Sequence, residues 1–210
     1  MHRPRGASAP GRAGRGRHRN GLDARHGKGV QNRRALLDAL VALVDEGTTR
    51  PTVPQIARRA GVSVRTVYHQ FDSIRQLLEA GVYLQATRHR AMLFTIPPRG
   101  TSELRITALC RQRRFYFEKV TPIRRFALSR ASQGVTPETL ADADRAILRD
   151  QLAHTLAPEL DMRGDHGPDL LDALEHATGW DAWNGLRDGR ARSPTSAERV
   201  MALTATSLLT

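Results

Sequence analysis

From residue 32 onward, apolar residues recur at the spacing of one helix face, and this pattern dominates the chain. The first such stripe, at positions i, i+4, i+7 and i+8, consists of Leu36, Leu40, Leu43 and Val44. It predicts a helix that ends near Gly47. No segment alternates apolar and polar residues in the way that predicts a β-strand. We therefore predict an all-α fold.

Residues 52–71 predict two short helices joined by a tight turn. Thr52 followed by Gln55 has the spacing of a capping box that starts the first helix. The small apolar inner face of this helix consists of Val53, Ile56, Ala57 and Ala60. Gly61 follows where a left-handed residue stops the helix, and Ser63 can cap the second helix. Val67 and Phe71 then face inward.

This spacing is typical of a helix-turn-helix DNA-binding motif. Two helices that cross closely need small packed residues and a glycine turn, and both are present between Thr52 and Phe71. In this motif the second helix enters the major groove with its N-terminal residues nearest the bases. The alternative is an ordinary αα-hairpin without a DNA-binding role.

The rest of the chain also shows helical periodicity. A fourth helix starts at Asp72 or Ser73 and runs to about Thr95, before Pro97 and Pro98. We predict further helices at residues 102–119, 122–132, 136–156, 168–187 and 196–209. This gives an N-terminal three-helix DNA-binding domain at 32–80 and a C-terminal helical ligand-binding and dimerisation domain at 81–210.

The net charge of +12 is concentrated in the N-terminal half. Residues 1–31 carry eight basic residues and one acidic residue, whereas residues 96–210 carry sixteen and fifteen. A basic front on a neutral back is typical of a phosphate-binding module joined to another domain, although a solvated basic surface is the alternative. Because residues 1–31 are rich in Gly and Arg and poor in apolar residues, we expect a disordered basic tail.

Several other classes of protein are disfavoured. A single cysteine, Cys110, excludes an internal disulfide and fits a reducing, cytoplasmic location. No apolar stretch predicts a membrane span, and the N-terminus does not resemble a signal peptide. No group of residues has the spacing of a catalytic site, so we predict neither an enzyme nor a cofactor. Asp161, Asp165 and His166 suggest a metal site, but a polar loop explains them better, and we predict no metal.

The motif also resembles that of the tetracycline-repressor-like (TetR) family. The resemblance rests on Val53-x-x-Ile56-Ala57-x-x-Ala60-Gly61-Val62-Ser63-x-x-Thr66-Val67-Tyr68-x-x-Phe71, followed by Leu77-Leu78. It implies a homodimer that binds double-stranded DNA and whose C-terminal helices bind a small-molecule effector that releases the DNA. We therefore predict a repressor of a palindromic operator. The rival is an architectural, nucleoid-type DNA-binding protein, supported only by the basic tail.

Roles in DNA binding follow from side-chain chemistry and from the resemblance. The candidates for phosphate contacts are Thr52, Arg58, Ser63, Tyr68 and Arg75. The candidates for the surface of the second helix that faces the DNA bases are Val64, Arg65, Thr66 and His69. The family usually places a phosphate-binding Lys where this chain has Ile74. Either the neighbouring Arg75 replaces that contact, or the contact is lost.

In the C-terminal half, residues 111–118 mix cations with aromatics, and we interpret them as a helix with one packed and one solvated face. The family resemblance suggests a ligand cavity lined by Cys110, Phe115, Tyr116 and Phe126. It also suggests a dimer interface made by the last two helices, with Leu170, Leu174, Ala177, Val200, Leu203 and Leu208. Trp180 and Trp183 pack either in the core or against the dimer partner.

Overall fold

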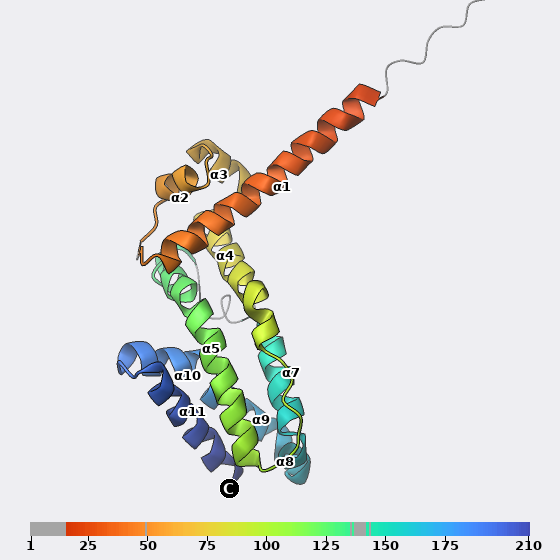
Figure 1. The fold of residues 1–210 in the computed structure, drawn as a ribbon, viewed down its shortest axis with the longest axis vertical. Helices are drawn as coiled ribbons and strands as arrows, with labels where there is room; N and C mark the ends of the chain where they lie inside the picture. Colours follow the sequence, from red (N-terminus) through yellow and green to blue (C-terminus); the bar gives the residue numbers. More distant parts are fainter. Residues whose placement is uncertain (1–15, 49, 135, 137–141, 143) are drawn as a thin grey trace, which may run out of the picture.

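The computed structural model describes residues 16–48, 50–134, 136, 142 and 144–210, and these ranges contain helices and no β-strand (Figure 1). The all-α prediction is confirmed. The first part of the chain forms α1 (Gly16–Asp45), α2 (Val53–Arg59), α3 (Val64–Gln70), α4 (Ile74–His89), the 3-10 turn η1 (Arg90–Met92), α5 (Ser102–Leu128) and η2 (Ala131–Gln133). The second part forms α7 (Arg145–Thr155), α8 (Ala157–Met162), η3 (Gly164–His166), α9 (Gly167–Thr178), α10 (Trp180–Asn184), the π-helical turn η4 (Gly185–Gly189) and α11 (Pro194–Leu209).

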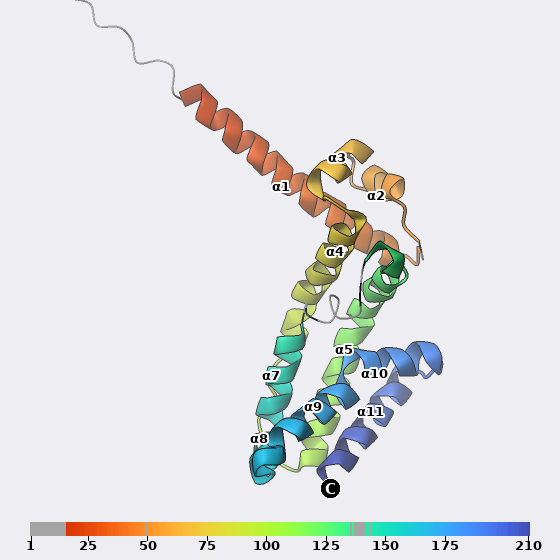
Figure 2. The same cartoon turned by 180° about the vertical axis from the view of Figure 1, so that it is seen from behind.

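Helix α1 is longer than the sequence pattern predicted, and its N-terminal half projects away from the rest of the molecule (Figures 1 and 2). We expected a disordered tail over residues 1–31, but residues 16–31 continue the helix, and residues 1–15 lie outside the described ranges. No proline falls between residues 16 and 45. Once the packed end of a helix has formed, each further residue adds one hydrogen bond, so α1 continues past residue 32 although Gly27 and Gly29 disfavour a helix there.

The N-terminal helices enclose an apolar core. Its fully buried side chains include Leu36, Leu40, Ile56, Leu77 and Leu78, with Val67 and Phe71 nearly so. Helices α1 and α4 approach closely at Gly81, where a Cβ atom would lie 2.9 Å from Leu40 Cδ2. A larger residue there would require the Leu40 side chain to shift, so the packing favours glycine at this position.

Helix α5 corrects our prediction of two helices at 102–119 and 122–132. It runs without interruption from Ser102 to Leu128 and contains Pro122. A proline inside a helix removes one hydrogen bond, but tertiary packing can hold the helix together across it. Here Ile123, Phe126 and Ala127, just beyond the proline, are buried in the N-terminal core. Helix α5 therefore belongs to both halves of the molecule.

Helices α4 and α5 pack against each other and connect the two halves (Figure 2). The domain boundary that we set at residue 80 lies inside α4, which continues to His89 and ends before the predicted Thr95. Because both connecting helices are continuous, the structure has no flexible linker at that point. Among the described residues, no helix is both long enough and apolar enough to cross a membrane.

The C-terminal helices pack around the N-terminal two thirds of α5. Helices α9 and α11 contact each other, α11 lies along α5, and α7 packs on α9. The helix predicted at 168–187 breaks at Gly179, whose backbone is extended and where a Cβ would lie 2.8 Å from Glu175 O. Trp180 and Trp183 both lie in the core of this half, which decides between the two alternatives for them. Of the helix predicted at 136–156, the structure shows α7; residues 137–141 and 143 lie outside the described ranges.

Candidate DNA-binding site

The turn between α2 and α3 has the geometry that the sequence predicts. The Thr52 backbone N–H donates to Gln55 Oε1 over 2.8 Å, and the Gln55 N–H donates to Thr52 Oγ1 over 3.4 Å, so the capping box is confirmed. Gly61 has a φ of +69°, a left-handed conformation that glycine adopts without strain. Ser63 Oγ accepts a hydrogen bond from the Thr66 N–H over 3.1 Å and caps α3.

Helix α3 has one buried and one exposed face. Val67 and the C-cap residue Phe71 point into the N-terminal core. The exposed side chains are Val64, Arg65, Tyr68 and His69, with Ser63 exposed at the cap and Thr66 half-buried. All of them are residues that we predicted to face DNA. The Thr66 hydroxyl shares a 2.8 Å hydrogen bond with Ser63 Oγ, which leaves Arg65 and His69 as the side chains best placed to read bases.

The C-terminal end of α3 is fastened to α1 by one arginine. Arg33 Nη1 donates to Gln70 O over 2.6 Å, and the Arg33 guanidinium lies 4.1 Å from the centre of the Phe71 ring. A cation at the C-terminal carbonyls also complements the helix dipole. The contact fixes the direction of α3 relative to α1.

A cleft of about 710 Å³ separates the N-terminal part of α1 from α3. Its lining residues are Lys28, Gly29, Val30, Asn32, Arg33, Ser63, Arg65, Thr66, His69 and Gln70. Lys28, Arg33 and Arg65 are cationic, and none of the residues that line the cleft is acidic. A concave surface with charge of one sign concentrates the opposite charge, here that of phosphate.

Sequence reasoning missed the α1 side of this cleft. Lys28 falls in the segment that we expected to be disordered, and neither Asn32 nor Arg33 was assigned a role. The absence of proline through residues 16–45 was the signal that could have extended α1 far enough to include Lys28. The contact of Arg33 with α3 depends on tertiary structure and has no signal in the local sequence.

The arginines of α2 differ in their availability. Arg58 is exposed, and none of the described residues pairs with it. Arg59 is also exposed, but it forms a bidentate pair with Glu46, with N–O distances of 3.0 and 2.5 Å. This hydrogen bonding lowers the pKa of Glu46 from its usual value. Thr52 and Arg58 are therefore exposed at α2 as predicted, and Arg59 is occupied.

Arg75 is directed along its own helix. Its Nη1 lies 3.5 Å from Glu79 Oε1, one turn further along α4, and the side chain lines a groove shared with Tyr83 and Asp142. Ile74, at the position of the family's Lys, packs partly buried against the N-terminal core. Replacing the missing phosphate contact would require Arg75 to leave Glu79.

The structure does not bring the four predicted ligand-cavity residues together. Cys110 and Tyr116 are fully buried in the C-terminal core, and Phe126 lies in the N-terminal core. Phe115 is 46% exposed and lines an apolar groove of about 600 Å³ on the outer face of α5. The grouping was wrong because helical spacing within 110–126 distributes these side chains around α5. Burial also raises the pKa of the Cys110 thiol to about 12.

The predicted dimer residues fall into two sets. Leu203 is 69% exposed and Leu208 37% exposed on α11, and Leu170, Ala177 and Val200 are half-buried. Leu174 is fully buried in the core of its own chain, so its assignment to a surface was wrong. It was misassigned because a single apolar stripe on α9 cannot reveal which of its residues the same chain covers.

Among the described residues, no three His, Cys, Asp or Glu side chains are grouped to hold a metal ion. Asp161 lies in α8, and Asp165 and His166 lie in η3, all three exposed.

A capped and exposed second helix, held on a first helix by small apolar residues and Gly61, defines a helix-turn-helix DNA-binding domain. Residues 36–80 match the family described as "Bacterial regulatory proteins, tetR family". This helix-turn-helix segment of the chain is therefore similar to the DNA-binding domain of TetR-family regulators.

Two curated relatives are both named "HTH-type transcriptional regulator BetI". They come from Escherichia coli O45:K1 (strain S88 / ExPEC) and Escherichia coli (strain UTI89 / UPEC). Each is 40% identical to this chain over 81 residues, which cover 37% of this chain and 42% of the relative. The match thus spans less than half the length of these curated relatives.

Proposed function

We propose that this protein is a dimeric transcriptional repressor that reads a palindromic operator with α3 and is released from it by a small molecule. The observation that carries the proposal is the exposed face of α3, with Arg65 and His69 beside a cleft lined by cations and by no acidic residue. A helix with this exposure, mounted on a rigid α2–turn–α3 unit, has the form of a recognition helix.

The contacts with DNA divide into two kinds. The Arg65 guanidinium can donate two parallel hydrogen bonds to O6 and N7 of guanine, which specifies a base. Thr52 and Arg58 at α2 and Lys28 at α1 flank α3 and are placed to contact phosphates, which sets the register without reading sequence. The Arg33 contact with Gln70 and Phe71 keeps α3 in a fixed direction as these contacts form.

The dimer is proposed to form through α9 and α11. Leu203 and Leu208 are exposed on α11, and Leu170 and Ala177 remain partly exposed on α9. Two copies related by a two-fold axis would bury these side chains in a four-helix interface. The two α3 helices would then enter major grooves roughly 34 Å apart or somewhat further.

The release of DNA by a ligand is proposed to act through the two connecting helices. Leu77 and Leu78 of α4 and Ile123 of α5 are buried in the N-terminal core, while the other ends of both helices lie in the C-terminal half. A ligand that moves either helix changes the position of α3 relative to its counterpart in the dimer. A ligand can shift the protein only by as much as it prefers one arrangement over the other.

The proposal is tested by selecting duplexes from a random pool with the purified protein and measuring the affinity for the selected sequence. A repressor of this kind recovers one pseudo-palindrome and binds it roughly 1,000-fold or more tightly than random duplex. Binding that shows no sequence preference would instead identify an architectural DNA-binding protein and contradict the proposal.

A pair of histidine variants serves as the internal control. His69→Ala removes an exposed side chain from the reading face of α3 and should weaken binding to the selected duplex. His154→Ala removes an exposed side chain from α7, outside the DNA-binding domain, and should leave binding unchanged. An equal effect of the two variants would mean that α3 is not the reading element.

A further inference from the structure

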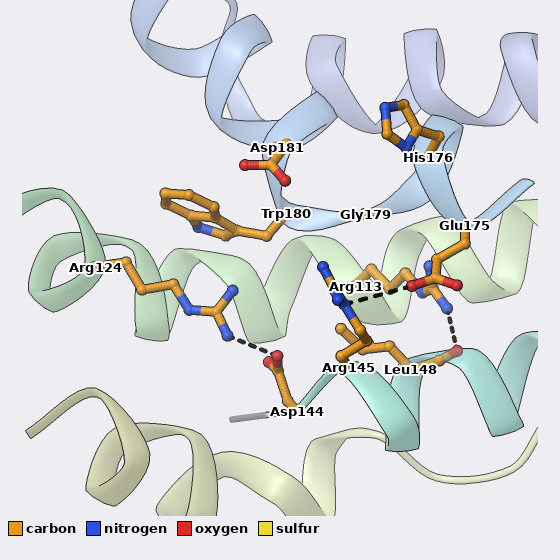
Figure 3. Close-up of a pocket in the computed structure, with 10 residues that line it drawn as sticks. All are labelled: Arg113, Arg124, Asp144, Arg145, Leu148, Glu175, His176, Gly179, Trp180 and Asp181. Atoms are coloured by element: carbon orange, nitrogen blue, oxygen red, sulfur yellow. Dashed lines mark hydrogen bonds and ion pairs between the residues drawn. The ribbon is translucent and has the colours of Figure 1, made fainter. Parts of the chain in front are cut away.

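A small cavity in the C-terminal half is surrounded by charged side chains from three segments of the chain (Figure 3). Its volume is about 110 Å³. Helix α5 contributes Arg113 and Arg124, the start of α7 contributes Arg145 and Leu148, and the α9–α10 segment contributes Glu175, Gly179 and Trp180 among others. The cavity is separate from the apolar groove at Phe115, which lies on another face of α5.

Arg113 is the buried cation of this cavity. Its Nη1 donates to Thr178 O over 3.0 Å and to Thr178 Oγ1 over 2.6 Å, and its Nη2 donates to Leu148 O over 2.7 Å. All three acceptors are uncharged. A guanidinium has five N–H donors, so two remain, and its Nε has no partner among the described residues. No carboxylate in the described ranges lies within ion-pair distance of it.

The Arg113 charge is only partly compensated, by carboxylates that do not contact it. Burial lowers the pKa of Arg113 to about 10, and the more distant carboxylates of Asp144 and Glu175 oppose that effect. The group therefore stays protonated at neutral pH. A buried charge without a counter-ion is unfavourable, and a bound anion with two oxygen acceptors would relieve that cost.

Most other charges of the lining have partners; Asp181 also lines the cavity, and no ion pair of its carboxylate is found among the described residues. Arg124 Nη2 donates to Asp144 Oδ1 over 2.7 Å, and its guanidinium lies 5.3 Å from the Trp180 ring centre. Glu175 accepts a hydrogen bond from Arg149, and it lies 4.0 Å from Arg145 at the rim (Figure 3). The positive charge available inside the cavity is therefore that of Arg113.

We propose that this cavity binds a small carboxylate, of the size of acetate or propionate, against the free donors of Arg113. We further infer that binding of the carboxylate in this cavity is the signal that releases DNA. The role as a release signal rests on the function proposed above, whereas the existence of the binding site is independent of that function.

The position of the cavity relative to the DNA-binding domain supports a role of carboxylate binding in the release of DNA. Arg113 and Arg124 lie on α5, and Ile123, next to Arg124, is buried in the N-terminal core. On the other side of the cavity, Asp144 lies two residues from Asp142, which lines the same groove as Arg75. An anion that draws Arg124 away from Asp144 would affect both α5, which reaches the N-terminal core through Ile123, and the segment at Asp142, which lies beside Arg75.

The test is a calorimetric titration of the full-length protein with sodium acetate at constant ionic strength, in a buffer without other carboxylates. Acetamide, which has the same shape without the charge, is the matched probe. We expect saturable binding of acetate and none of acetamide. No saturable binding of acetate, or equal binding of both probes, would overturn the proposed site.

Two variants and one control locate the binding. Arg113→Met keeps an apolar stem of similar length and should weaken acetate binding at least tenfold. Glu175→Gln removes a carboxylate that repels the anion and should tighten binding by up to roughly tenfold. This gain keeps the proposal testable if Arg113→Met fails to fold. Arg111→Met, exposed on the same helix, should change nothing; loss of binding there would move the site to the outer groove and overturn the proposal.

A separate titration of the selected duplex, with and without saturating acetate, tests the signal. We expect acetate to weaken duplex binding by tenfold or more in the wild type and not in Arg113→Met. Saturable acetate binding with unchanged duplex affinity would retain the site and reject its role in release. Failure to select any duplex would reject the proposed function while the calorimetric result still decides the site.

Discussion

The two halves of this molecule place their charged side chains in opposite ways. Among the described residues, the polar and charged side chains that are buried all lie at residue 85 or beyond, and they include Arg105, Arg113, Arg124 and Asp144. In the N-terminal domain the core is apolar, and the arginines such as Arg58 and Arg65 are at the surface. The N-terminal domain therefore keeps its cations at the surface, whereas the C-terminal half also buries some of its arginines.

This difference separates two kinds of recognition. Exposed cations attract any polyanion and release counter-ions on binding, so they suit a ligand as large and as highly charged as DNA. Enclosed cations are out of reach of DNA, and each needs an acceptor inside the protein or a small anion that enters. Arg105 forms an ion pair with Glu159, and Arg124 forms one with Asp144. Arg113, by contrast, donates hydrogen bonds only to uncharged acceptors.

The comparison predicts that the two cores can be destabilised separately. Phe71→Ala empties the centre of the N-terminal core and should cost roughly 3–5 kcal/mol of its stability. Both tryptophans lie in the C-terminal core. In urea, the helical circular dichroism of this variant should therefore begin to fall before the tryptophan fluorescence changes.

Tyr68→Ala is the matched control, because Tyr68 lies on the exposed side of the same helix. Its effect on unfolding should stay within about 0.5 kcal/mol. If the two signals of Phe71→Ala change together, α4 and α5 join the halves into one cooperative unit, and the description of two separable cores is wrong.

The next largest effect is expected at the proposed dimer interface. Leu203→Arg introduces a charge into the exposed apolar surface of α11 and should weaken dimerisation by roughly 100-fold or more. Sedimentation at micromolar concentration should then show a monomer. Met162→Arg on α8 is the control, since Met162 is 77% exposed but lies outside the proposed interface, and it should remain dimeric. A monomeric wild type would reject the interface altogether.

A smaller effect on stability is expected at Thr52, the N-cap of α2 in the helix-turn-helix. Thr52→Ala removes the side chain that accepts from Gln55 N–H and should cost about 1 kcal/mol of N-terminal stability in the absence of DNA. Thr87→Ala, an exposed position in α4 that caps no helix, should cost less. Equal losses from the two variants would show that the α2 cap contributes nothing of its own.

The sequence was sufficient where the signals are local. The caps at Thr52 and Ser63, the left-handed Gly61 and the inward Val67 and Phe71 all follow from spacing over a few residues, and the structure has each of them. The exposed face of α3 follows from the same periodicity. These parts of the candidate site were predicted because a helix-turn-helix encodes its geometry within twenty residues.

The sequence was insufficient where contacts with distant segments of the chain determine the local structure. Pro122 indicates a helix end, but packing of the following turn on the N-terminal core keeps α5 continuous. Within residues 111–118 we predicted a helix with one packed and one solvated face, without assigning individual residues to either face. The structure has both faces, with Arg113 buried against carbonyl groups of α7 and α9 and Phe115 exposed. Acceptors thirty-five or more residues away cannot be identified from local pattern.

The central claim is that α3 reads bases, and the most direct test is a titration of Arg65→Ala against the selected duplex and its single-base variants at several salt concentrations. Arg58→Ala, which removes an exposed cation of α2, is the matched control. Arg65→Ala should cost roughly 1–3 kcal/mol on the selected duplex and relax the preference at one base pair per half-site. Arg58→Ala should weaken all duplexes about equally and lower the salt dependence by about one unit per lost phosphate contact. If Arg65→Ala also weakens every duplex equally, Arg65 contacts phosphate, and the claim that it reads a base is wrong.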